Sequence, residues 1–572
     1  MKKYIYSIMI TVGLVFQSCE DILDQKAVDS FNEDVVFSDI NLVKAYIGAC
    51  YSMMGSKNTD GQAVDGVLGL HRDMLTSATD QSLGTFRAAN YVLLKGTMSP
   101  DQLGYFANNA HGGWLLWTNL YNNIQNLNTI LARIDDVPVS TSSDESLRTR
   151  LKGEAYFIRA LMYTHLLLVH GGVVLTDRPF KLNDDFQSVR RSSIAETKDF
   201  ILTDIAKAIE LLPAAMEQGR ATRGAAAAVK SRLLLFCAGK LTNGGYEPNN
   251  TLVSFPSGSQ RALLETARDA AKDIIDGKYG NYALVGKTSE PSLPLTDVQI
   301  NEYANVFFNI FNQKGAWNSE TIWGIQFPLK DGRVNQVNLW NGPNGYHNYG
   351  NNNPTEAVVR AFEMADGTPF VWDIDNPNND TIRKATAEQL ADNPLLNPYN
   401  GREPRFYASI LYHGAPWQQR PNDAKGFEPD NIIQTGHIYN QNGTVLRNGV
   451  DTRQGPIDEW NGTKTGYYMK KYLDPETQGQ LQNNTNAWIE YRYAEVLLNY
   501  AEACIELGGA DLQKGLDALN LVRHRAGLPS RVATDQETAR QYVRHEREIE
   551  FFGEGIRFWD LRRWMAMKDV VK

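Results

Sequence analysis

The stretch GEAYFIRALMYTHLLLVHGG, residues 153–172, decides the fold class of this chain. It completes a longer segment, 142–170, whose apolar side chains recur every three or four residues and so share one helix face. These apolar residues are Leu147, Leu151, Ala155, Ile158, Met162 and Leu166. Ser142-x-x-Glu145 predicts a capping box at the start, and Gly171-Gly172 predicts the C-terminus. A long helix of this kind needs other helices to cover its apolar face.

The segments on either side repeat this pattern. Ser193-x-x-Glu196 predicts a second capping box, before an apolar stripe that ends at Pro213. Further helices are expected over residues 223–239, 490–507 and 512–527, and after Thr534-x-x-Glu537. Helix pairs joined by short turns predict a mostly α fold with a tetratricopeptide-like helical-repeat scaffold. The strict signature of that repeat, about 34 residues long, is not visible.

The middle of the chain has a different composition. Between residues 277 and 480, glycine, asparagine, proline and aromatic residues dominate, as in WNGPNGYHNYGNNNP (340–354). Only short strand-like pieces such as ETIWGIQF (320–327) interrupt these loops. Long ordered loops tend to carry function. We therefore expect 277–480 to be an irregular but ordered segment that carries function, between helical parts at 41–276 and 481–572.

The N-terminus predicts export. Residues 1–18 have the order of a signal peptide: two lysines, then an apolar run, Tyr4–Phe16, shorter than the about 20 residues of a membrane-spanning helix. Ser18-Cys19 resembles a bacterial lipobox, although Phe16 stands where leucine is usual. This predicts a lipoprotein with acyl chains such as palmitate on Cys19 and a tether over 19–40. An ordinary signal peptide with a coincidental cysteine is the alternative.

Composition and charge argue against several functions. The net charge is −9 and no basic block occurs, so no nucleic-acid partner is expected. The four cysteines match no zinc pattern, and Cys237 and Cys504 fall in apolar helical runs, where inert core thiols are expected. We predict no metal site or cofactor. Calcium at DIDNPNND (373–380) is the exception left open, although the spacing is not that of an EF-hand.

No catalytic motif of the HExxH, GxSxG, Walker A or GxGxxG type is present. Two carboxylates at a suitable separation would serve a glycosidase, but the sequence does not give that separation. In EREIEFFGEGIRFWDLRRW (546–564), alternating charges predict a solvated or ion-paired helix face rather than an active site. Its aromatic residues Phe551, Phe558, Trp559 and Trp564 are expected to join the final helices to the core.

Several segments together resemble a known family. GEAYFIRALMYTHLLLVHGGVVLTDRPF (153–180) resembles its long helix and following turn, with valine where aspartate is common. TGYYMKKY (465–472), YRYAEVLLNYAEA (491–503), LNLVRHRAGLP (519–529) and HEREIEFFGEGIRFWDLRRW (545–564) resemble its C-terminal signature. The order is collinear over essentially the whole chain. The chain resembles the SusD/RagB nutrient-binding outer-membrane lipoproteins of the Bacteroidota.

This resemblance implies a function without catalysis. The irregular segment 277–480 would bind the ligand and pack on four tetratricopeptide-like helix pairs, so that 41–572 form one unit. The protein would be anchored by lipid to the outer membrane and face the cell exterior. Its partner would be a SusC-type TonB-dependent transporter, to which it delivers a captured glycan. Glu20, Asp21 and Asp24 resemble the acidic tag that sends such lipoproteins to the surface. One alternative is the same fold binding peptides or another non-sugar nutrient, and a second is a secreted glycoside hydrolase.

Sugar binding needs flat apolar faces together with planar hydrogen-bonding side chains. Residues 340–352 supply both, in Trp340, Asn344, Tyr346, His347, Tyr349 and Asn351. The resemblance implies a contribution from loops near 65–115, where we note Asp73, Arg87, Asn90 and Trp114. The alternative is that 340–352 is a loop buried against the helices or the transporter.

The other aromatic residues are assigned less directly. Trp117, Tyr121 and Trp323 are expected to be structural, and the sequence leaves Trp417 undecided. Because loop aromatics at a ligand site do not hold a core, we expect Trp340 and Tyr346 to be replaceable without loss of stability.

Overall fold

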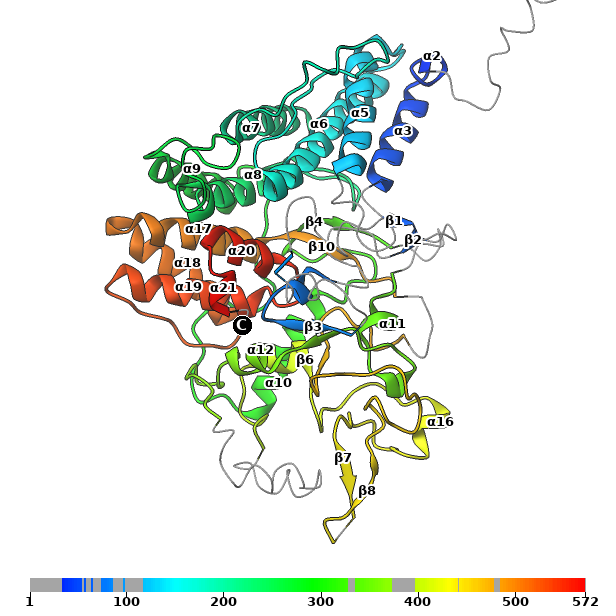
Figure 1. Cartoon of the computed structure of the whole chain (residues 1–572), viewed down its shortest axis with the longest axis vertical. Helices are drawn as coiled ribbons and strands as arrows, with labels where there is room; N and C mark the ends of the chain where they lie inside the picture. The colour runs from blue at the N-terminus through cyan, green and yellow to red at the C-terminus, as the bar shows by residue number, and fades with distance from the viewer. Residues whose placement is uncertain are drawn as a thin grey trace, which may run out of the picture.

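The computed structural model describes residues 33–53, 56–57, 63–64, 74–85, 96–97, 117–327, 335–372, 397–440, 442–477 and 484–570. Long helices occupy the two ends of the described chain, and loops with short strands occupy the middle (Figure 1). This confirms the mostly α fold. Cys19 and the calcium candidate at 373–380 lie outside the described residues. None of the described helices is long and apolar enough to cross a membrane.

The N-terminal part is a layer of neighbouring helices. They are α2 (Glu33–Val36), α3 (Ile40–Ser52), α5 (Trp117–Arg133), α6 (Ser142–His170), α7 (Ile194–Leu211), α8 (Arg223–Cys237) and α9 (Ser259–Ile275). Helix α6 contacts α3, α5, α7 and α8, so it lies at the centre of this layer (Figure 1). Its predicted apolar stripe is buried from Leu151 onward, as a helix covered by neighbours requires.

The helix caps follow the predicted chemistry, with two shifts in position. The capping box of α7 is formed by Ser193 and Glu196, as predicted. The box of α6 is formed by Thr141 and Asp144, one residue before the predicted pair. The N-cap of α19 is Asp535 rather than Thr534. In both cases a neighbouring residue can take the position, because Thr, Ser and Asp side chains all accept hydrogen bonds from the exposed N–H groups of the first turn.

The folded part begins before residue 41, the boundary expected from the sequence. Helix α2 occupies Glu33–Val36, and the side chains of Phe37 and Ile40 are buried in the scaffold core. Arg133 of α5 lies over the ring of Phe37, with 5.0 Å between the guanidinium carbon and the ring centroid. Residues 33–40 therefore belong to the scaffold rather than to the tether.

The C-terminal helices complete the scaffold. They are α17 (Tyr493–Leu507), α18 (Leu512–Arg525), α19 (Gln536–Glu550), α20 (Ile556–Trp564) and α21 (Met567–Val570). Helix α17 packs on α8 and α9, which joins the two ends of the chain (Figure 1). The helix predicted from residue 490 starts at Tyr493, because β10 (Trp488–Arg492) pairs with β4 (Thr321–Ile325).

The middle segment has its own hydrophobic core and short elements. They are α10 (Asp297–Ile310), β4, α11 (Val337–Asn341), η7 (Asn344–Tyr346), β5 (Asn352–Pro354), α12 (Glu356–Ala361), α15 (Pro404–Ser409), β6 (Ile410–Leu411), α16 (Asn422–Lys425), β7 (His437–Tyr439), β8 (Val445–Asn448) and β9 (Tyr468–Met469). The expectation of loops and strands alone is wrong for α10, which Thr296 and Gln299 open with a capping box. Residues such as Phe307, Phe406 and Trp488 fill this second core.

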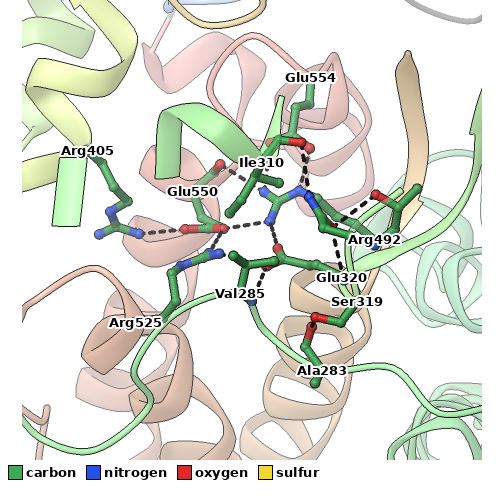
Figure 2. Close-up of polar contacts among 12 residues, drawn as sticks. Ala283, Val285, Ile310, Ser319, Glu320, Arg405, Arg492, Arg525, Glu550 and Glu554 are labelled. Atoms are coloured by element: carbon green, nitrogen blue, oxygen red, sulfur yellow. Dashed lines mark hydrogen bonds and ion pairs between the residues drawn. The ribbon is translucent and has the colours of Figure 1, made fainter. Parts of the chain in front are cut away.

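A buried ion-pair network connects this second core to the C-terminal helices (Figure 2). The Glu550 carboxylate of α19 forms ion pairs with Arg492 Nη1 at 2.7 Å and with Arg405 Nη1 at 2.9 Å, and it also pairs with Arg525. Glu320 bridges Arg492 and Arg525 from the other side. Burial acts to raise the pKa of Glu550, but these guanidiniums lower it below the usual range.

The sequence predicts either a solvated or an ion-paired helix face at 546–564. The charged residues are ion-paired, and they lie inside the protein rather than on a solvated face. Of its aromatic residues, Phe551, Phe558 and Trp564 are buried, whereas Trp559 is only partly covered. The thiols of Cys237 and Cys504 are buried as predicted, and burial raises their pKa values to about 12 and about 11. Such thiols carry no thiolate at neutral pH, so they are inert.

Candidate functional site

The predicted aromatic loop starts on helix α11 and ends in strand β5. Residues 342–351 turn back on this helix: Tyr349 N donates to Leu339 O at 2.8 Å, and Asn351 N donates to Trp340 O at 2.7 Å. The loop is therefore held by its own backbone hydrogen bonds. A fixed loop presents its outward side chains in one geometry, which lowers the ordering cost of ligand binding.

Two predicted site residues point inward. Tyr346 is fully buried, its hydroxyl donates to Gln418 O at 2.7 Å, and Arg420 lies over its ring at 4.5 Å. Asn344 is also fully buried, and its amide donates to Thr452 O at 2.7 Å. Gly345 between them lies so close to Asp451 that a Cβ would meet Oδ1 at 2.4 Å. This glycine permits close approach of protein rather than ligand.

Three predicted residues remain partly exposed. The rings of Trp340 and Tyr349 meet edge to face, with centroids 5.0 Å apart, and the Trp340 indole N–H donates to Gln336 at 2.9 Å. His347 has a left-handed backbone, φ 62°, which is uncommon outside glycine. Its Nε2 lies 3.0 Å from Asp423 Oδ2. These three side chains form the outer part of the predicted cluster.

The structure brings the second predicted region next to this loop. Strand β3 (Ser82–Gly84) pairs antiparallel with β5, with Leu83 opposite Asn353. Thr85 N donates to Asn351 Oδ1 at 2.8 Å. Asn351, one of the predicted site residues, therefore binds the end of β3 to the aromatic loop. The four residues predicted in this region, Asp73, Arg87, Asn90 and Trp114, lie outside the described residues.

Trp460 is a candidate site residue that the sequence analysis does not identify. Its side chain is 79% exposed, whereas the other tryptophans of the described ranges are buried or partly buried. The turn that carries it is packed on the aromatic loop: Gly462 N donates to Tyr349 O, and the Asn344 amide reaches Asp458 O at 3.3 Å. The available signal was a tryptophan between glycine-, asparagine- and aspartate-rich residues, DEWNGTKTG at 458–466. An exposed indole there offers a flat apolar face to a ligand.

A polar cavity of about 540 Å³ adjoins this turn. It is lined from strands β7 and β8 and from the 452–464 loop, by Thr435, Gly436, His437, Asn448, Thr452, Arg453, Gln454, Glu459, Thr463 and Lys464. Lys464 Nζ donates to Thr85 O at 3.2 Å, which connects the cavity to the end of β3. Hydroxyl, amide and charged groups of this kind match the adjacent hydroxyls of a sugar.

The remaining aromatic residues divide as follows. Trp323 is fully buried. The Tyr121 hydroxyl donates to Val174 O at 2.6 Å, and its ring packs against Trp117 with centroids 4.8 Å apart, so these three residues are structural as predicted. Trp417, undecided from sequence, is partly buried against Phe308. Within the described ranges, no group of three or more His, Cys, Asp or Glu residues is placed to hold a metal ion.

Comparison with known proteins shows which family this chain is similar to. Residues 306–572 match the model of the SusD family, and residues 101–235 match a model described as starch-binding associating with outer membrane. SusD-like protein P38 of Formosa agariphila is 22% identical over 592 residues, which covers 100% of this chain and 94% of that protein. A SusD-like protein of Bacteroides ovatus is 22% identical over 78% of this chain and 65% of its own length.

Solved structures agree with the fold. A SusD-like protein from Bacteroides fragilis superposes with a TM-score of 0.66 at 27% identity, covering 93% of this chain and 87% of that chain. A SusD-like carbohydrate-binding protein from the same species has a TM-score of 0.66 at 22% identity, covering 94% and 88%. A laminarin-binding SusD-like protein has a TM-score of 0.57 at 18% identity, covering 93% of each. With both family models matched in order along one chain of this fold, the protein belongs to the SusD/RagB family.

Proposed function

We propose that this protein binds a glycan on the surface formed by Trp340, Tyr349 and Trp460 and by the adjoining polar cavity. The observation that carries the proposal is the packing of the exposed Trp460 turn on the aromatic loop, through Gly462 and Tyr349. It places flat apolar rings beside a cavity lined by hydrogen-bonding side chains. The family models and the carbohydrate-binding relatives support the same ligand class.

The energetics fit a protein that captures and then releases its cargo. An aromatic contact contributes about 0.5–1.5 kcal/mol, and a neutral hydrogen bond contributes about as much. Several such contacts, less the cost of ordering the ligand, give modest affinity. We propose that the captured glycan passes to a SusC-type TonB-dependent transporter and that the protein itself performs no catalysis. We also propose that a lipid on Cys19 anchors it in the outer membrane, facing the cell exterior.

Affinity electrophoresis against a glycan panel that includes laminarin and starch tests the binding surface. We expect Trp460→Ala and Trp340→Ala each to weaken binding several-fold, as loss of about 0.5–1.5 kcal/mol per ring predicts. The matched control is Phe186→Ala, which removes a ring that is 55% exposed in the scaffold loop before α7 and should leave binding unchanged. Melting temperatures are measured on every variant.

The same glycan panel, together with a set of peptides and an assay for reducing ends, distinguishes the alternatives. Unchanged affinity in both tryptophan variants would remove the proposed surface. Binding only to peptides would favour a non-sugar nutrient, and release of reducing ends from a bound glycan would establish a hydrolase.

A further inference from the structure

A second cavity, of about 700 Å³, lies at a different place in the middle segment. Its walls come from the first turn of α10, from residues 400–416 around α15 and β6, and from Lys470. No residue that lines it also lines the cavity beside Trp460. In Figure 1, α10 and β6 lie close together, apart from the β7–β8 hairpin that borders the first cavity. Its volume falls in the range of small-molecule pockets, about 300–1,000 Å³.

Lys470 is the unusual group in this cavity. Its Nζ donates one hydrogen bond, to Tyr407 O at 2.8 Å, and lies 5.3 Å and 5.8 Å from the ring centroids of Phe308 and Trp417. Among the described residues, no carboxylate lies within ion-pair distance of it. An ammonium has three donors, so the side that faces the cavity can still donate. Burial lowers the pKa of Lys470 to about 8, which shows how poorly its surroundings compensate the charge.

The next residue provides the contrast. Lys471 is fully buried, and its Nζ pairs with Glu554 Oε1 at 2.7 Å and donates to Glu550 O at 3.0 Å. The chain therefore supplies a carboxylate to one of two adjacent lysines, the buried Lys471, and none within ion-pair distance to the partly buried Lys470 among the described residues. The other lines a cavity whose walls also include two tyrosines and two asparagines, Tyr407, Tyr412, Asn301 and Asn400.

We propose that this cavity is a second saccharide site, specific for a sugar unit with an anionic substituent that pairs with Lys470. The partly exposed side chains of Tyr407 and Tyr412 offer aromatic contacts, and the amides of Asn301 and Asn400 offer partners for hydroxyl groups. An anion beside a desolvated ammonium is stabilised more than it would be in water. The chain has a net charge of −9, which repels an acidic sugar, and a local cation offsets this repulsion.

Asp297 is a second residue through which the proposal can be tested. It lines the same cavity at the first turn of α10, is exposed, and repels an incoming anion. The other titratable groups on the cavity walls are Tyr407 and Tyr412. Burial raises the pKa of both, so they stay neutral near pH 8. Lys470 is then the cavity-lining group whose charge changes in that range.

The test uses glucuronate, with glucose as the uncharged sugar and acetate as the anion without a ring. Calorimetry at pH 7 should show glucuronate binding more tightly than either control compound. Lys470→Met should weaken glucuronate binding about tenfold or more, as expected for a charge-assisted hydrogen bond. Asp297→Asn should strengthen it, and Lys207→Met, which removes an exposed scaffold lysine paired with Glu210, should not change it.

Lysine labelled with ¹³C at Cε gives a readout that does not depend on the heat signal. The Lys470 resonance, assigned by its absence in Lys470→Met, should titrate near pH 8, and glucuronate should move its midpoint upward because the anion favours the charged form. An inorganic sulfate titration asks whether any anion suffices. Trp460→Ala should retain glucuronate binding, which separates this site from the proposed glycan surface.

Three results would overturn the proposal. They are an unchanged Lys470 resonance in saturating glucuronate, equal affinity for glucuronate and either acetate or sulfate, and equal affinity of the wild type and a folded Lys470→Met protein. Loss of glucuronate binding in Trp460→Ala with Lys470→Met unaffected would assign the acidic sugar to the first surface instead.

Discussion

The aromatic residues of one loop divide between the core and the surface. Tyr346 is enclosed by protein, with its hydroxyl on Gln418 O and Arg420 over its ring, whereas Trp340 and Tyr349 stay partly exposed. The expectation that Tyr346 can be replaced without loss of stability therefore changes. Its removal leaves a cavity in the second core, and it leaves Arg420 without its ring contact.

Tyr346→Ala should lower the free energy of unfolding by about 3–5 kcal/mol, the range for large aromatic truncation in a core. Tyr346→Phe should lower it by about 1–3 kcal/mol, because Gln418 O loses its buried donor. Urea unfolding followed by circular dichroism measures both. Trp460→Ala, at an exposed position, is the matched control and should leave the midpoint unchanged. Equal stability of Tyr346→Ala and the wild type would contradict the buried assignment.

Between elements, buried charge pairs set how the C-terminal helices meet. Glu502 on α17 accepts from both terminal nitrogens of Arg563 on α20 and from the Trp564 indole at 2.7 Å. Burial acts to raise the pKa of Glu502, but Arg563 and Arg547 lower it to about 2. A buried pair of this kind adds little compared with an apolar replacement, yet removing one partner leaves an uncompensated charge.

This pair makes stability depend on pH. The folded-state pKa of Glu502, about 2, lies below the unfolded value of about 4.3, so its contribution is fully present above pH 4.3 and is lost as pH falls toward 2. The size is on the order of 3 kcal/mol, from 1.36 kcal/mol per pKa unit. Glu502→Gln should lower stability at pH 7 by about 3–5 kcal/mol and flatten its decline between pH 5 and pH 3.

Urea midpoints at several pH values measure the slope for each protein. The control is Glu210→Gln, which alters an exposed glutamate on α7 and should decline in parallel with the wild type. A slope for Glu502→Gln equal to that of the wild type would show that this carboxylate does not contribute.

At the scale of the whole molecule, the helical scaffold and the proposed binding surface are separate. One hydrophobic core fills the helical layers, and the other fills the middle segment that carries Trp340 and Trp460. In Figure 1, α11, α16 and the β7–β8 hairpin lie on the side away from α7 and α9. The network around Glu550 joins the two cores (Figure 2). This division lets the loops specify the ligand while the helices keep their packing.

The proposed anchor also belongs to this scale. Cys19→Ala should move the protein from the membrane fraction to the soluble fraction, because without acyl chains the chain has no lipid to hold it. Immunoblots of fractionated cells measure the distribution, with Cys237→Ala as the matched cysteine control that should stay in the membrane fraction. Persistent membrane association of Cys19→Ala in cells that lack the transporter would contradict the lipid anchor.

The sequence by itself determined the helical scaffold, because apolar spacing, caps and glycine stops are local signals that each helix carries in its own residues. It also located the aromatic loop at 340–352. Two features came only from the tertiary structure. Whether a loop aromatic faces inward, like Tyr346, or outward, like Trp460, depends on segments more than 70 residues away that cover it or leave it open. The pairing of β3 with β5, like the different surroundings of Lys470 and Lys471, joins parts of the chain that share no local pattern.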